Sequence, residues 1–180
     1  MLHINIPETE LYDERTNEFI HVKPRTLALE HSLVSISKWE AKWCKPFISK
    51  EDMTEEQTID YIRCMTLTQN VPPETYRCIT NSIVDEIAEY INAPMTATWF
   101  SEEKNKKGSR EVITSEVIYY WMIALQIPPE YQKWHLNRLL TLIRVCNNKN
   151  TPPKKLGKST LANQYAALNA ARRKKYNSKG

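Results

Sequence analysis

The side chains that most often bind metals or act as nucleophiles are few in this chain and lie far apart. No histidine has another histidine two, three or four residues away, so the helix-face spacing of a zinc site is absent. No two cysteines lie closer than fourteen residues, which excludes a C-x-x-C motif. We expect reduced, buried thiols and ordinary packed or surface histidines. The residues concerned are Cys44, Cys64, Cys78, Cys146, His3, His21, His31 and His135.

Two adjacent carboxylate pairs, Glu55-Glu56 and Asp85-Glu86, have the residue types used in general acid–base catalysis. Neighbouring residues on a helix point about 100° apart, so neither pair converges on one site, and solvated helix faces are expected. The chain has only three glycines, and their spacing permits neither a dinucleotide-binding fingerprint nor a P-loop. The sequence therefore predicts no catalytic residue, no metal site and no cofactor, and we do not expect an enzyme.

Charge is distributed very unevenly along the chain. Residues 1–130 carry thirteen Lys/Arg and twenty-one Asp/Glu, a formal charge of −8; residues 131–180 carry twelve Lys/Arg and no acid, which is +12 and brings the total to +4. Such asymmetry indicates an anionic partner for the basic end: nucleic acid, an acidic protein surface, or the acidic half of another copy. The cations expected to make exposed contacts are Lys154, Lys155, Arg172, Arg173, Lys174 and Lys175.

Aromatic residues recur at helical spacing within apolar stretches. Such residues can stack on bases, but at this spacing they more often belong to the core. As partner-binding anchors we single out Trp39, Trp43 and Trp121. The corresponding candidate groove is formed by 29–43 and 115–125.

Alternating apolar and polar residues at 2–7 and 18–23 predict a hairpin over residues 2–23. Helical spacing then predicts a helix over 27–44, ended by Pro46. The T-x-x-Q pattern from Thr54 to Gln57 is a capping box that opens a helix to Met65. Pro73 suits the first turn of a helix reaching Ile91, which carries isoleucines in one i, i+4 row.

The second half of the chain predicts further helices. Residues 95–100 and 112–113 suit a second hairpin around a charged loop at 101–111. Thr114 caps a predicted helix to Leu125, and the uncharged run 117–129 is too short to span a bilayer, so we expect a buried core helix. A helix over 129–148, apolar over most of its circumference, is expected at the centre of the core.

Residues 147–158 form a polar, proline-containing linker, and 159–175 predict a last helix that ends in RRKK and has a narrow apolar side. The predicted fold is mainly α: a bundle-like single domain with a small N-terminal β-hairpin and a basic C-terminal helical arm. The expected division is a helical core over 1–148 and an arm over 149–180.

A resemblance rests on the segments ITSEVIYYWMIALQIPPEYQKWHLNRLLTLIRVCNNKN (113–150) and ALNAARRKKYNSKG (167–180), together with LEHSLVSISKWEAKWCKPF, DYIRCMT and PMTATWF. These segments resemble small proteins of long-tailed bacteriophages, the tail assembly chaperones. The resemblance runs from about residue 11 to the end. It implies binding of the long helical tape-measure protein, which is kept soluble until the tail tube polymerises around it. It also implies a location in the host bacterial cytoplasm and absence from the finished particle, and no catalytic residue. In this family a longer product is often made by frameshifting near the end of the shorter one.

Two other interpretations remain open at this stage. One is a nucleic-acid-binding phage protein that uses the basic C-terminal half. The other is a structural virion component of the tail or connector. A homo-oligomer is compatible with all three interpretations, and no membrane association is expected.

Overall fold

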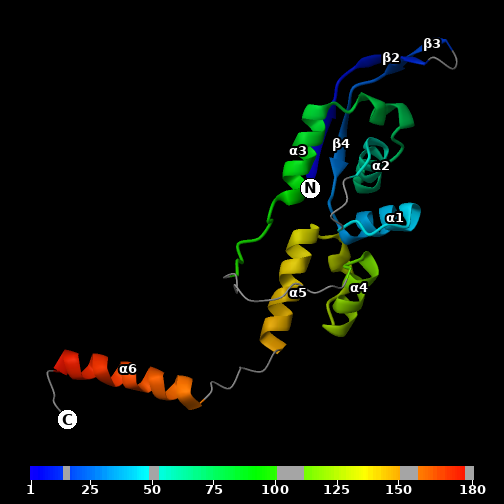
Figure 1. Cartoon of the computed structure of the whole chain (residues 1–180). Coiled ribbons are helices and arrows are strands. Elements are labelled where there is room, and N and C mark those ends of the chain that lie inside the picture. The colour runs from blue at the N-terminus through cyan, green and yellow to red at the C-terminus, as the bar shows by residue number, and fades with distance from the viewer. Residues whose placement is uncertain (14–16, 49–52, 101–111, 151–157, 177–180) are drawn as a thin grey trace. The chain divides into compact units, whose positions relative to one another are not determined.

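The computed structural model describes residues 1–13, 17–48, 53–100, 112–150 and 158–176 (Figure 1). The chain divides into two compact units, Met1–Asn147 and Asn148–Gly180. The first is mostly helical with β-strands at its start, and the second is built on one helix. The helical fold class predicted from periodicity is therefore confirmed. Each helix in the described residues is too short or too polar to cross a lipid bilayer.

The N-terminal strands form one long antiparallel hairpin that is interrupted halfway. Strand β1 (Leu2–Ile6) pairs with β4 (Arg25–Leu29), and β2 (Thr9–Asp13) pairs with β3 (Glu18–Val22). The two ladders stop at Ile6↔Arg25 and Thr9↔Val22, and a proline lies in each strand connection between them. Because proline has no N–H to donate, the ladder breaks there into two short sheets.

The predicted hairpin over 2–23 was therefore wrong in its pairing, since Leu2–Ile6 faces 25–29 and not 18–23. The start of the predicted helix over 27–44 was wrong for the same reason. Leu27 and Leu29 are fully buried with Ala28 between them, which is the period of a strand. Helix α1 (Leu33–Trp43) begins only after Ser32, whose hydroxyl accepts from the Ser35 N–H.

Helix α2 (Glu55–Met65) begins as predicted. The Thr54 hydroxyl accepts from the Gln57 N–H at 3.3 Å, and the Gln57 side chain accepts from the Thr54 N–H at 3.0 Å. After α2 the chain turns back onto β4: the Leu67 N–H donates to the Ala28 carbonyl at 2.8 Å and the Glu30 N–H to the Met65 carbonyl at 3.0 Å. These bonds cover the outer edge of β4.

Two helices predicted as continuous are each divided. Residues 73–91 form a 3₁₀ helix, η1 (Pro73–Cys78), and then α3 (Asn81–Asn92), with Thr80 extended between them. Residues 129–148 form η2 (Pro129–Lys133) and then α5 (Leu136–Asn150). The second break exists because His135 makes a β-bridge with Ser32, and the Leu136 N–H donates to the His31 carbonyl at 2.8 Å.

The predicted second hairpin is not present in the described residues, where 93–100 and 112–114 contain no strand; its charged loop at 101–111 lies outside them. Helix α4 (Ser115–Ala124) matches its predicted range closely. Residues 151–157 of the predicted linker are not described, and α6 (Lys158–Tyr176) confirms the predicted last helix.

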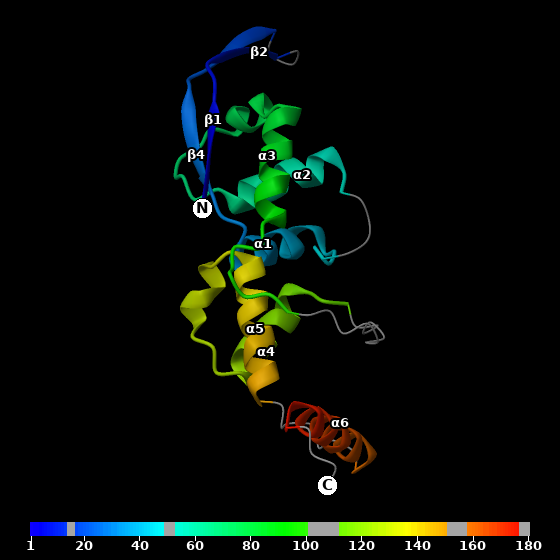
Figure 2. The ribbon, with the colours of Figure 1, turned by 90° about the vertical axis from the view of Figure 1, so that its left-hand side faces the viewer.

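The core of the first unit gathers around α1, which packs against α2 on one side and α4 on the other (Figures 1 and 2). Helix α5 buries one side only: Leu139 is fully buried, whereas Leu140 and Leu142 are half-exposed. The prediction that this helix lies at the centre of the core was therefore wrong, because only Leu136, Leu139 and Ile143 of α5 are buried. The fully buried large side chains include Ile4, Ile6, Leu27, Leu29, Leu33, Ile36, Trp39, Ile62, Met65, Ile118 and Leu139.

Candidate partner-binding site

Helix α4 exposes apolar side chains along one face. Tyr120 is 67% exposed and Ile123 is 76% exposed, and Ala124 beside them is also exposed. Val117 and Trp121 are half-buried at the edge of this face. We call these five residues the α4 face. The prediction of a fully buried helix at 117–129 was wrong for this side of α4, because only Ile118 and Met122 of the helix's apolar residues are fully enclosed.

A single buried carboxylate holds the start of α4. Glu40, on α1, accepts from the Ser115 N–H with Oε2 and from the Phe47 N–H with Oε1, each at 2.7 Å. A carboxylate that accepts from a helix N-terminus is stabilised by the positive end of the helix dipole. Further along, the Tyr119 hydroxyl donates to Gln132 Oε1 at 3.0 Å. These contacts fix α4 on the rest of the first unit, so the exposed face belongs to an anchored helix.

The α4 face carries almost no charge. Glu116 is the one charged residue of α4 and lies in its first turn. Hydrogen bonds from its own backbone N–H, and then from Thr114, lower the pKa of its carboxyl group. At neutral pH the ionised Glu116 therefore marks one end of an otherwise apolar surface. Such a surface on an anchored helix is a feature of sites that bind another protein.

The three tryptophans predicted as anchors do not form one surface. Trp39 is 2% exposed and its indole N–H donates to the Gln57 carbonyl at 3.0 Å, so it is a core residue and the prediction of an accessible anchor was wrong. Trp43 is half-buried and donates to Asp60 Oδ2 at 2.9 Å, which ties α1 to α2. Trp121 alone lies on the α4 face.

The predicted basic contacts divide between described and undescribed residues. Lys154 and Lys155 lie outside the described residues. Arg172, Arg173, Lys174 and Lys175 are exposed in the last turns of α6. Their exposure agrees with the expectation for surface contacts, and what they contact stays a prediction.

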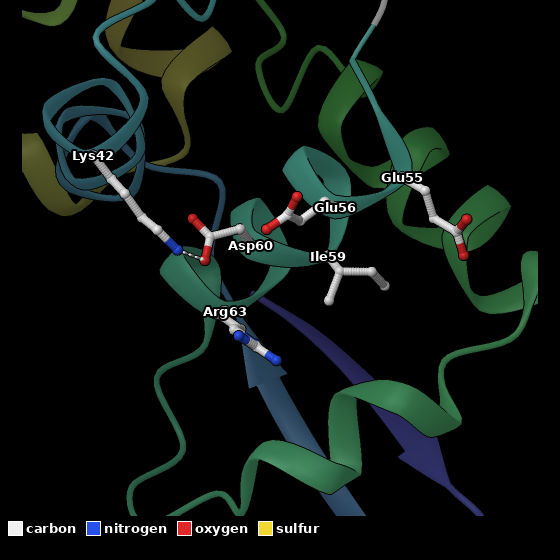
Figure 3. A pocket seen from close by; sticks show the side chains of 6 residues that line it. All are labelled: Lys42, Glu55, Glu56, Ile59, Asp60 and Arg63. Carbon is white, nitrogen blue, oxygen red and sulfur yellow. Dashed lines mark hydrogen bonds and ion pairs between the residues drawn. The ribbon is translucent and has the colours of Figure 1, made fainter. Parts of the chain in front are cut away.

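A charged depression of about 400 Å³ lies beside α2 (Figure 3). The Asp60 carboxylate in it pairs with the Lys42 ammonium and also accepts from Trp43, so its strongest interactions are internal. Figure 3 shows Glu55 extending away from Glu56 and Asp60, as expected for neighbours on a helix. Burial, and then the nearby Asp60 charge, raise the pKa of the Cys64 thiol, which disfavours the reactive thiolate. The arrangement is that of a structural ion pair. Its lining residues are Lys42, Glu55, Glu56, Ile59, Asp60 and Arg63.

The described residues contain no group of three or more His, Cys, Asp or Glu side chains that could hold a metal ion. The sequence placed 115–125 in a candidate groove and singled out Trp121 as an anchor, but it did not single out Tyr120 and Ile123, the most exposed members of the α4 face. The sequence held a hint of this face: the helix is apolar around most of its circumference, although a helix at the surface of a small domain has to expose one side.

No known family model, curated protein or solved structure matches this chain.

Proposed function

We propose that this protein is a tail assembly chaperone of a long-tailed phage and that it binds the helical tape-measure protein through the α4 face. The observation that carries the proposal is the exposure of Tyr120 and Ile123 on a helix that the body holds in place. The resemblance of 113–150 and 167–180 to this family supports the identity of the client.

A helical client suits the spacing of the α4 face. Tyr120, Ile123 and Ala124 are three and four residues apart, so they form a ridge along the helix surface. Ridges of this kind pack into the grooves between side chains on a second helix. A tape-measure protein is a long amphipathic helix whose apolar stripe needs cover before the tail tube forms around it. The α4 face supplies that cover.

The small number of exposed apolar side chains on the α4 face sets the expected strength of one contact. Burying a side chain such as Ile123 contributes about 1.5–3 kcal/mol relative to leaving it in water. Two such side chains and the edge of Trp121 give a weak single site, since association also costs translational and rotational freedom. Many copies along one long client then act together, and the client is covered without any tight individual complex.

A structural virion component is the competing interpretation of the same apolar face. A chaperone acts in the host cytoplasm before the tail is complete and is absent from purified particles. A tail or connector subunit is present in them at fixed stoichiometry. Mass spectrometry of purified virions separates the two: detection at subunit stoichiometry replaces the chaperone with the structural component.

Introducing charge into the α4 face is expected to abolish client binding. In co-expression, the wild-type protein should keep the tape-measure protein soluble, whereas Tyr120→Glu and Ile123→Glu should each reduce the soluble client at least several-fold. The reason is that a carboxylate buried against an apolar stripe loses its hydration without gaining a partner. The measurement is the ratio of client in supernatant and pellet.

Phe19→Glu is the matched control. Phe19 is 73% exposed, a value close to that of Tyr120 and Ile123, but it lies on β3. This variant should keep the client as soluble as wild type does. Equal client solubility with all three variants, or with no chaperone at all, would remove the α4 face from the proposal.

A further inference from the structure

Helix α6 carries its large apolar side chains on one side. Tyr165, Leu168 and Tyr176 are each more than half exposed, and the turn of the helix points all three in one direction. Arg172 and Lys175 lie on the same side, between Leu168 and Tyr176, and are also exposed. We call these five residues the α6 stripe. It is an apolar surface that becomes basic toward the end of the helix.

The mixed composition of the α6 stripe indicates the kind of partner that covers it. A row of phosphates or a wholly acidic surface would pair with Arg172 and Lys175 but would leave Leu168 without an apolar contact. A partner for the whole stripe has to be apolar along part of its length and acidic at one end. That description fits a protein surface.

The α4 face with its flanking acid has this composition. Glu116, Tyr120 and Ile123 follow one another along α4 at intervals of four and three residues, and all three are exposed. Residues at these intervals lie on the same side of a helix. Among the described residues Glu116 has no ion pair. Its carboxylate is therefore available to a cation from outside the first unit.

The α6 stripe has the same spacing in the opposite direction. Read backwards from Arg172, the next members are Leu168 and Tyr165, again at intervals of four and three residues. An antiparallel arrangement of α6 on α4 therefore places Arg172 beside the acid and the two apolar residues beside the two exposed apolar residues of α4. It also places the negative end of the α6 dipole beside the positive end of α4, which is favourable.

The charges of the two units favour a contact between copies. The unit Met1–Asn147 carries sixteen Lys/Arg and twenty-one Asp/Glu, a formal charge of −5, whereas Asn148–Gly180 carries nine Lys/Arg and no acid, a charge of +9. Unlike units of two copies attract one another, and such attraction speeds association and selects its orientation.

We propose that the α6 stripe of one copy packs antiparallel on the α4 face of a second copy, and that this contact covers the α4 face until the client displaces it. Reciprocal exchange makes the contact twice in a closed dimer with twofold symmetry. The covering role rests on the proposed function of the α4 face. The dimer itself does not, because it forms without a client.

The first test is sedimentation equilibrium of the full chain in the absence of client. Wild type should approach twice the mass of one chain as its concentration rises. Leu168→Glu and Ile123→Glu should each raise the dissociation constant at least about tenfold, because a carboxylate at either position loses its hydration against apolar side chains. Both positions are exposed in the single chain, so circular dichroism should be unchanged. A wild-type protein that stays monomeric at every concentration overturns the proposal.

Exchange of the two charges tests the register of the contact. Glu116→Lys and Arg172→Glu should each weaken the dimer several-fold, because each brings like charges together in both contacts. A mixture of the two variants should restore wild-type association, since both contacts of the mixed dimer then pair opposite charges. Lys174→Glu is the control: it makes the same kind of charge change on the opposite side of α6 and should leave the dimer intact. A mixture that stays monomeric, or a Lys174→Glu protein weakened as much as Arg172→Glu, overturns the proposal.

Client solubility separates this inference from the chaperone proposal. Leu168→Glu should be monomeric and should keep at least as much tape-measure protein soluble as wild type does, because its α4 face is unchanged and uncovered. Less soluble client with this variant would show that α6 supports client binding, which overturns the covering role. Dimers that form as expected while Ile123→Glu leaves the client soluble would instead contradict the chaperone proposal alone.

Discussion

Replacing Leu139 with alanine is expected to lower the free energy of unfolding by about 2–5 kcal/mol. Leu139 is fully buried on α5 and belongs to the main core together with Leu136 and Ile143. The loss combines the transfer of the deleted methyl groups to water with the cavity that remains between α5 and the body. Urea denaturation measures it, as a lower midpoint with little change in the slope.

Leu140→Ala is the matched control, because it makes the same chemical change one residue further along α5. Leu140 is only partly buried at the edge of the core, so its truncation removes less buried area. The expected loss is about half that of Leu139→Ala or less. Equal losses for the two variants would contradict the burial of α5 along one side only.

Acid is expected to destabilise the first unit through His31. Its side chain is 2% exposed, its Nδ1 lies 2.5 Å from the Tyr61 hydroxyl, and its ring centroid is 5.1 Å from that of His135. Burial, and then repulsion by His135, lower the pKa of His31 from 6.5 to about 3. Burial also lowers the pKa of His135, whose Nε2 donates to the Tyr90 carbonyl at 3.0 Å.

These pKa values set the direction in which stability changes with pH. Between pH 6.5 and 3 the unfolded chain binds a proton at His31 that the folded chain does not, so stability is lost as pH falls through this range. From pH 7 to pH 5, His31 alone should lower the free energy of unfolding by about 2 kcal/mol. Denaturant titrations at the two pH values measure the difference between them.

The variant His31→Gln should flatten this pH dependence by about the same amount, whatever its stability at pH 7. His3→Gln is the control, because His3 is exposed and its replacement removes a histidine without touching the buried pair. A wild-type pH dependence retained in His31→Gln would show that protonation of other groups causes the acid sensitivity.

Local rules predicted the parts of this fold that depend on neighbouring residues. The capping box from Thr54 to Gln57 placed the start of α2 correctly, because both of its hydrogen bonds form within one turn. The start of α4 at Ser115 and the extent of α6 also agree with the prediction from helical spacing, but the predicted cap of Thr114 on α4 was wrong, because Thr114 makes no side-chain capping hydrogen bond.

The errors lie where long-range contacts override local preference. Leu27 and Leu29 fit a helix pattern with the residues after them, but β1 pairs with this segment and selects the strand. The helix predicted from 129 onward breaks at His135 because that residue bridges to Ser32, about a hundred positions earlier in the chain. Single-sequence patterns hold no information about such a pairing.

The candidate site was only half predictable for a related reason. Spacing located the helix 115–125 and drew attention to Trp121, but it did not show which side α1 covers. The side was decided by Ile118 and Met122, which pack inward and leave Tyr120 and Ile123 outside. Trp39 and Trp43 are tryptophans at helical spacing, as Trp121 is. Their indole N–H groups donate to α2, so both are part of the packing of the first unit.

Site-specific photocrosslinking during co-expression with the tape-measure protein tests the central claim most directly. The photoreactive residue p-benzoylphenylalanine is placed at position 123 in the α4 face and, as a control, at the equally exposed position 19 on β3. The chaperone account predicts crosslinks to the client from position 123 and none from position 19. Crosslinks from position 19 alone, or none from position 123 to a client that is present and soluble, would contradict it.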